Sequence, residues 1–190
     1  MNFSRLLCVA LFALPLAVFA AEPGVLKVDR SRSFVEVDVD ATKNFTARLD
    51  RYDMAVGFDA TGKVKSAVLN FKFTDLKSSD TKRDADMIEW LGGGEPDGRF
   101  ELGNLAVTPA GLGQASGRLF FHGAVDRVEM PVTVTRTGDD FTITGETTID
   151  YRNWNLKVIR KAFLFSVSPD VKVRFKISGT IIDAPPAAKK

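Results

Sequence analysis

Apolar and polar residues alternate one by one along most of the chain, which is the pattern of half-buried β-strands. The first clear run, residues 33–41, places Val35, Val37 and Val39 between carboxylate residues. Further runs predict strands over residues 45–50, 52–59, 63–74, 99–108, 112–122, 125–136, 139–149 and 170–183. The total is eight strands if residues 45–59 form one bent strand, and one more if they form two.

Short turn sequences separate these runs, such as DATG at residues 59–62 and TGDD at residues 137–140. Strands joined by such short links are antiparallel neighbours. An antiparallel sheet with one apolar face buries that face either against a second sheet or by closing into a barrel. The alternation fits both solutions, so the sequence predicts an all-β, antiparallel domain.

Residues 75–91 interrupt the alternation and predict one short helix. The sequence SSDT at residues 78–81 supplies helix-capping side chains. Met87, Trp90 and Leu91 then share one helix face. Three glycines at residues 92–94 end the helix.

Residues 1–20 have the composition of a secretory signal peptide. Arg5 precedes an almost wholly apolar run, and a cleavage site with a small residue follows at Ala20. The run of about 14 apolar residues is shorter than the roughly 20 that span a bilayer. We therefore expect export, a mature domain over residues 21–183 and a loose tail over residues 184–190. The only cysteine, Cys8, lies within this leader, so the mature chain has no thiol.

Charge and motifs exclude several classes of function. The chain has 26 Lys and Arg against 24 Asp and Glu, which leaves no basic surplus for an extended nucleic-acid interface. It has no glycine-rich phosphate loop, no GxSxG and no HExxH motif. His122 is the only histidine, and its place beside Gly123 in a turn favours a structural role. We expect no catalysis, no metal and no cofactor.

Phenylalanine dominates the residues that are expected to face inward. The chain has 15 Phe against two Tyr and two Trp. An interior rich in Phe and poor in hydroxyls suits an alkyl or isoprenoid chain, which needs no hydrogen bonds. The same residues also fit a solid core, and alternation alone does not distinguish a hollow interior from a filled one. The residues expected to contact a ligand are Val37, Val39, Phe45, Leu69, Phe71, Phe73, Met87, Trp90, Phe100, Leu102, Leu119, Phe121, Met130, Val132, Phe141, Ile143, Trp154 and Phe175.

Three charged residues are candidates for contact with a polar headgroup: Arg83, Asp84 and Arg152. Charges at a helix start, where Arg83 and Asp84 are expected, more often serve capping and solvated pairing. Trp90 and Trp154 flank the same region and fit either a gate or ordinary core packing.

Three segments resemble the YceI-like family of bacterial periplasmic proteins. They are GRLFFHGAVDRVEMPV at residues 117–132, TKRDADM at residues 81–87 and RFEL at residues 99–102. The resemblance extends over nearly all of the mature chain. It implies an antiparallel, eight-stranded, lipocalin-like barrel in the periplasm that binds, sequesters or transports an isoprenoid, a quinone or a fatty-acid-like lipid. It also implies a small hydrophobic partner and allows transient contact with a membrane surface.

The chain departs from the family pattern at polar positions. Arg32 and Ser33 stand where the family commonly has His-Ser, and Asp40 or Ala41 stands where a second histidine is usual. The family's Arg-x-Asp-aromatic-Gly stretch is replaced by YRNWNL at residues 151–156, and a glycine-rich loop occupies residues 92–98. These departures leave the fold in place but weaken transfer of headgroup recognition. They also support an alternative function, a packed barrel that acts as a stress-response or protein-interaction module.

Overall fold

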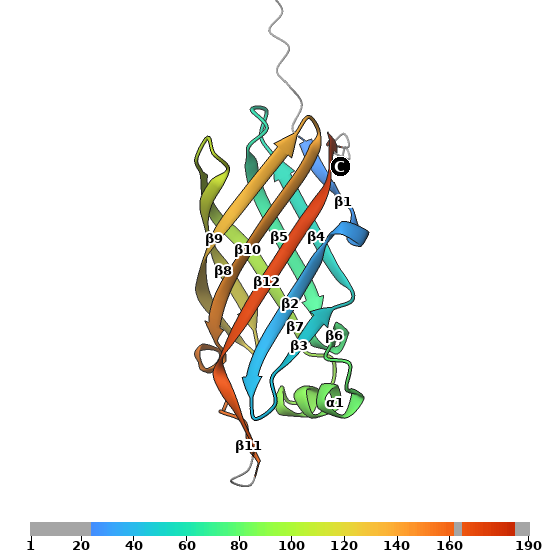
Figure 1. Ribbon diagram of the computed structural model, residues 1–190, viewed down its shortest axis with the longest axis vertical. Helices are drawn as coiled ribbons and strands as arrows, with labels where there is room; N and C mark the ends of the chain where they lie inside the picture. Colours follow the sequence, from blue (N-terminus) through green and yellow to red (C-terminus); the bar gives the residue numbers. More distant parts are fainter. Residues whose placement is uncertain (1–23, 162–164, 185–190) are drawn as a thin grey trace, which may run out of the picture.

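The computed structural model describes residues 24–161 and 165–184 (Figure 1). The expected signal peptide at residues 1–20 and most of the expected tail, residues 185–190, lie outside the described residues.

Eight strands form a closed antiparallel ring, and each is hydrogen-bonded to the next. In ring order they are β1 (Gly24–Val28), β4 (Tyr52–Phe58), β5 (Val64–Lys72), β7 (Asp97–Val107), β8 (Leu112–Phe121), β9 (Ala124–Thr137), β10 (Asp140–Asp150) and β12 (Phe165–Asp183). The ring closes because β1 pairs on one edge with β4, at Val25 and Gly57, and on the other with the end of β12. The predicted eight-stranded barrel is therefore confirmed.

The remaining strands complete the wall at the lower end in Figure 1. There β2 (Phe34–Ala41) takes the place of β1 beside β12, and β3 (Phe45–Leu49) and the short β6 (Leu76–Lys77) follow it. Residues 45–59 thus form two strands, β3 and β4, and not one bent strand. A two-residue strand, β11 (Arg160–Lys161), pairs with the start of β12.

One α-helix, α1 (Thr81–Trp90), lies across the lower end of the barrel (Figure 1). Asp80 caps it, because its carboxylate accepts hydrogen bonds from the backbone N–H groups of Lys82 and Arg83. Beyond the helix, Gly92, Gly93 and Gly94 all have positive φ, a conformation that glycine adopts without steric cost. The predicted helix and its glycine stop are confirmed. Short 3₁₀ turns are η1 (Arg30–Arg32), η2 (Phe73–Asp75) and η3 (Tyr151–Trp154).

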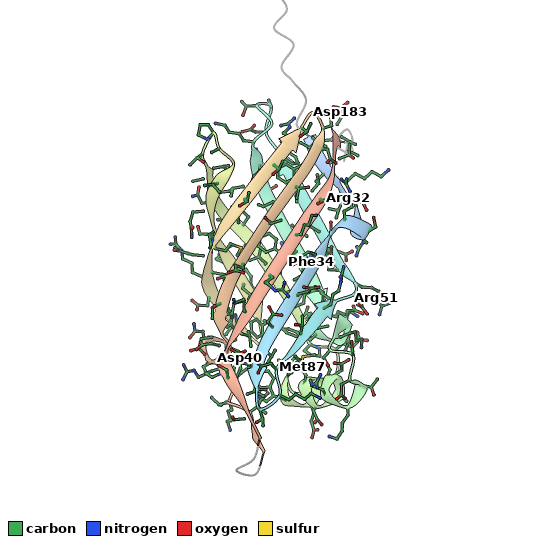
Figure 2. All side chains as sticks on the ribbon, viewed as in Figure 1. Arg32, Phe34, Asp40, Arg51, Met87 and Asp183 are labelled. Atoms are coloured by element: carbon green, nitrogen blue, oxygen red, sulfur yellow. The ribbon has the colours of Figure 1, made fainter. Side chains whose placement is uncertain are left out.

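Charged side chains project outward around the barrel, with Arg32 and Arg51 among those labelled in Figure 2. On the outer face of β12 and β2, the Arg174 guanidinium donates to both carboxylate oxygens of Asp38, at 2.6 and 3.1 Å. These hydrogen bonds favour the ionised carboxylate, so Arg174 lowers the pKa of Asp38 below its usual range. Thr46 on β3 adds a hydrogen bond to the same carboxylate at 2.7 Å.

Candidate functional site

The lower half of the barrel is hollow. On β2, Val37 and Val39 face inward, and so do Leu69 on β5 and Val173 on β12, yet all four side chains are only half-buried. A residue that points into a barrel and still has accessible surface faces a void, because the wall shields it from outside solvent. These residues surround a cavity of about 1060 Å³. Alternation alone did not distinguish a hollow interior from a filled one. The structure shows that the lower half of the barrel is hollow.

The upper half of the barrel is packed with side chains. Val56, Phe58, Phe141 and Ile177 are each at most 5% exposed. Phe58 and Phe141 meet edge to face with ring centroids 5.2 Å apart, which is a favourable aromatic geometry. Ile177 lines the cavity whereas the two phenylalanines do not, so the cavity ends at the level of Ile177.

Most of the residues expected to contact a ligand line this cavity. They are Val37, Val39, Phe45, Leu69, Phe71, Phe73, Met87, Trp90, Phe100, Leu119, Phe121, Met130 and Phe175. They come from α1, from the turn η2 and from seven strands of the wall, so the structure brings into one space residues that are up to 138 positions apart (175 minus 37). Their role in binding stays a prediction.

Five other residues of that set are placed outside the cavity lining: Leu102, Val132, Phe141, Ile143 and Trp154. They contribute instead to the packed clusters of the core. Trp154 is the clearest case, since it is 1% exposed and its indole Nε1 donates to the carbonyl oxygen of Leu119 at 2.9 Å. Its ring also stacks on Phe121 with centroids 4.7 Å apart. The structure thus gives Trp154 a core position and not that of a gate.

The lining also includes residues that the sequence did not single out. Met54 on β4 belongs to a predicted strand and follows from its alternation. Leu156, Val158 and Ile159 belong to an irregular segment between η3 and β11, where no periodic pattern marks which side chains face inward. Val167 lies in the part of β12 that precedes the predicted start at residue 170.

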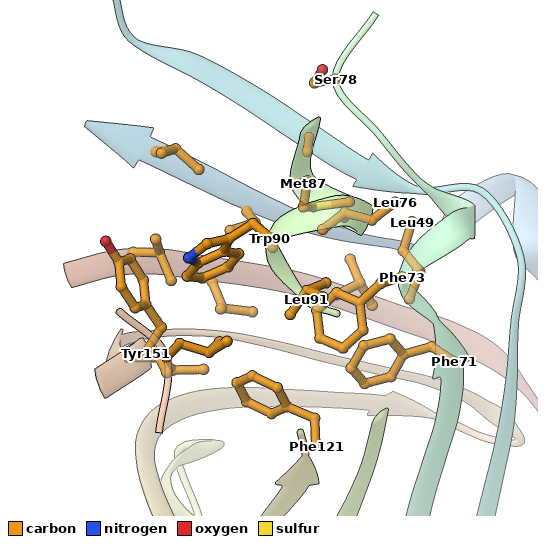
Figure 3. A pocket seen from close by; sticks show the side chains of 18 of the residues that line it. Leu49, Phe71, Phe73, Leu76, Ser78, Met87, Trp90, Leu91, Phe121 and Tyr151 are labelled. Atoms are coloured by element: carbon orange, nitrogen blue, oxygen red, sulfur yellow. The ribbon is translucent and has the colours of Figure 1, made fainter. Parts of the chain in front are cut away.

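Helix α1 covers the hollow end of the barrel (Figure 3). The indole Nε1 of Trp90 donates to the backbone oxygen of Lys157 at 2.9 Å, and its ring meets that of Tyr151 edge to face at 5.0 Å. Leu91, Tyr151 and Leu156 form a buried cluster beneath this contact. Trp90 therefore attaches the C-terminal end of α1 to the segment on the opposite side of the opening.

The candidate headgroup residues differ in position. Arg83 and Asp84 line the cavity, and the Arg83 guanidinium lies over the Phe45 ring, 4.1 Å from its centroid. Asp84 accepts hydrogen bonds from the backbone N–H and the hydroxyl of Ser78, at 3.0 and 2.6 Å. These contacts anchor the first turn of α1. Arg152 is exposed, does not line the cavity and pairs with the neighbouring Asp150 at 2.6 Å, so the structure does not place it at the candidate site.

The cavity opens where its lining becomes exposed and charged. Asp80, Lys82 and Glu89 of the α1 region and Lys157 opposite them are exposed lining residues. The Lys82 ammonium pairs with Asp86, one helical turn along, at 3.1 Å. The mouth thus carries charges of both signs, whereas the walls are almost entirely apolar.

His122 has the structural place that its sequence context favours. It adopts φ 48° in the turn between β8 and β9, and its Nδ1 lies 2.8 Å from the backbone oxygen of Trp154. Within residues 24–161 and 165–184, no group of three or more His, Cys, Asp or Glu side chains has a geometry that could hold a metal ion. No helix in the same ranges is long and apolar enough to cross a membrane.

Comparison with known proteins relates this barrel to solved structures of similar fold. BcnA from Burkholderia cenocepacia matches with a TM-score of 0.68 at 18% identity, covering 81% of this chain and 100% of that chain. A polyisoprenoid binding domain from Saccharophagus degradans matches with a TM-score of 0.61 at 16% identity, covering 87% of this chain and 99% of that one. The YCEI protein of Campylobacter jejuni gives a TM-score of 0.61 at 12% identity, with 73% and 85% coverage.

The sequence itself was compared in two further ways. A search of curated proteins gives no significant match. The model of the YceI-like domain matches residues 26–179, which include every strand of the barrel ring at least in part. The chain therefore belongs to the YceI-like family.

Proposed function

We propose that this protein is an exported, periplasmic barrel that binds one long apolar amphiphile in its cavity and sequesters or transports it. The observation that carries the proposal is the set of inward-facing but half-buried residues around the 1060 Å³ cavity. Ligand pockets of globular proteins commonly measure about 300 to 1,000 Å³, so the cavity is large for a small-molecule site.

The cavity walls favour a chain without polar groups. Two polar side chains of the wall are already engaged: the Thr147 hydroxyl donates to the Glu129 backbone oxygen at 2.8 Å, and the Tyr151 hydroxyl lies 3.5 Å from the Val167 oxygen. Neither needs a partner from the ligand. If each methylene takes the ~30 Å³ that a water molecule takes in the liquid, the cavity has room for about 35 carbon atoms at most.

Hydrophobic burial supplies enough free energy for useful affinity. Each methylene removed from water contributes about 0.8 kcal/mol, so a dozen contribute roughly 10 kcal/mol before the costs of ordering the ligand. Since the cavity ends at Ile177 and its charges lie around α1, the chain enters tail first and its headgroup stays at the mouth. An isoprenoid, a quinone or a fatty acid has this division into apolar tail and polar head.

Two further observations support the proposal. The Saccharophagus degradans domain with the same fold is named a polyisoprenoid binding domain. The composition of residues 1–20 supports export to the periplasm. Binding without turnover fits a cavity whose walls are almost entirely apolar.

Native mass spectrometry of the purified protein tests the proposal. We expect a lipid adduct that co-purifies at one molecule per chain, and reloading after delipidation with a neutral isoprenoid alcohol such as geranylgeraniol. A bare protein mass before and after incubation with geranylgeraniol, palmitate and a long-chain quinone would contradict it.

A further inference from the structure

Every methionine in residues 24–161 and 165–184 lines the cavity: Met54, Met87 and Met130. They come from three separate elements, β4, α1 and β9. The remaining methionine, Met1, and the only cysteine, Cys8, belong to the expected leader. The three thioethers are therefore the only sulfur groups in the described part of the chain, and all of them border the space proposed for a lipid chain.

Their accessibility differs in a way that depends on the cavity. Along β4, Met54 shares the inner face with Tyr52 and Val56, which are 7% and 5% exposed, whereas Met54 itself is half-buried. Its accessible surface therefore faces the cavity. Met87 of α1 is half-buried and lies near Trp90 (Figure 3). Met130 is 7% exposed in the wall opposite Ala115 of β8.

The thioether of methionine is a two-electron reductant for peroxides, and its sulfoxide is polar where the thioether was apolar. An amphiphile with an unsaturated chain forms alkyl hydroperoxides on exposure to oxygen. Within this cavity the hydroperoxide would lie against the methionine sulfur atoms. The sulfur takes the terminal oxygen as the O–O bond breaks, and the proton passes to the departing alkoxide. The products are a methionine sulfoxide and the lipid alcohol.

We propose that Met54, Met87 and Met130 form an oxidation site at which a hydroperoxide carried in the cavity is reduced to its alcohol, and that the resulting sulfoxides weaken ligand binding. The inference rests on the proposed function, because the cavity must hold the hydroperoxide. A sulfoxide that faces an alkyl chain loses its hydrogen bonds to water on ligand binding. We expect about a tenfold loss of affinity when Met54 is oxidised, since Met54 has surface in the cavity. Met54 and Met87 react before Met130, which is the most buried of the three.

The test uses linoleic acid hydroperoxide as the probe and tert-butyl hydroperoxide, which has no chain to fill the cavity, as its control. Peptide mapping by mass spectrometry follows the addition of one oxygen to each methionine, and chromatography follows the lipid alcohol. We expect oxidation of Met54 and Met87 at least tenfold faster with the lipid hydroperoxide than with equimolar control, and one alcohol formed per sulfoxide. Palmitate binding, measured by native mass spectrometry, should weaken about tenfold after oxidation.

Methionine-to-leucine variants separate reaction from binding, since this exchange nearly conserves volume and is well tolerated in cores. The triple variant M54L/M87L/M130L should form no alcohol, and its own palmitate affinity should be the same before and after treatment with the lipid hydroperoxide. If the triple variant does not fold, each single methionine-to-leucine variant is compared with the natural chain in the same assays of alcohol formation and palmitate affinity. Uptake of the hydroperoxide without sulfoxide or alcohol, or unchanged affinity after oxidation, would overturn this inference alone. Failure of the reduced protein to bind any amphiphile would instead overturn the proposed function.

Discussion

Replacement of Leu69 by Asp is expected to abolish uptake of an apolar chain and leave the barrel folded. Leu69 lies midway along β5, with Met54 and Phe100 opposite it on the two neighbouring strands, and its side chain faces the cavity. Because Leu69 is only half-buried, a carboxylate at this position keeps contact with water in the unliganded cavity. The bound chain removes that water.

The magnitude follows from two contributions. The bound alkyl chain loses contact with two or three carbon atoms of the side chain at position 69, which costs about 2 kcal/mol. Covering an ionised carboxylate with hydrocarbon costs several kcal/mol more, even after local relaxation. A combined penalty of at least about 4 kcal/mol lowers the affinity about a thousandfold. Geranylgeraniol is the suitable ligand, because a neutral headgroup excludes simple charge repulsion from the result.

Asn70→Asp is the matched control. It adds the same charge one residue along β5 on the exposed outer face, where Asn70 accepts a hydrogen bond from the Arg99 guanidinium at 2.9 Å. Isothermal titration calorimetry should give unchanged affinity for the control and no measurable binding for Leu69→Asp, with circular dichroism reporting a folded barrel in both. Affinity of a folded Leu69→Asp protein within threefold of the natural chain would refute the cavity as the binding site.

Three further predictions concern the core, the mouth and acid stability. Trp154→Phe removes the buried hydrogen bond to the Leu119 carbonyl and part of a tightly packed ring, and should lower the free energy of unfolding by about 2 kcal/mol, measured by urea denaturation; no change would contradict a core role. Trp90→Phe removes the hydrogen bond to Lys157 and should speed ligand dissociation about tenfold in stopped-flow measurements, whereas an unchanged rate would show that this contact does not retain the ligand. Arg174 lowers the pKa of Asp38 in the folded protein below its value in the unfolded chain. The ionised Asp38 therefore stabilises the fold at pH values above its unfolded pKa, and this stabilisation is lost as the pH falls through its folded pKa. The free energy of unfolding should therefore stay level above about pH 5 and decline below about pH 4, a decline that Asp38→Asn should reduce.

Much of the barrel could be predicted from the sequence because its strands are half-buried. Alternation such as that of Val35, Val37 and Val39 follows directly from one face being inside. Strand β1 was not predicted, because its five residues are too few to show a clear alternation of apolar and polar positions and only Leu26 is fully buried. It nevertheless closes the ring, which depends on pairing with residues more than 150 positions away.

The position of the cavity could not be predicted from the same pattern. Phe71 and Phe141 both lie on inward faces of strands, yet Phe71 lines the cavity and Phe141 packs against Phe58. Whether an inward side chain meets a void or a neighbour depends on the volumes of residues on distant strands, which alternation does not encode. Arg152 was expected to contact the headgroup, but it pairs with Asp150 on the surface. The presence of Asp150 two residues earlier is the sequence signal that could have indicated this ion pair.

A crystal structure with an alkyl chain that carries bromine at its terminal carbon would test the central claim most directly, because anomalous scattering locates the bromine, and with it the chain end, directly. We predict a single bromine peak inside the barrel, at the closed end near Ile177, with the headgroup beside α1. Bromine located on the outer surface, or absent from crystals grown with saturating ligand, would contradict a lipid-binding lumen.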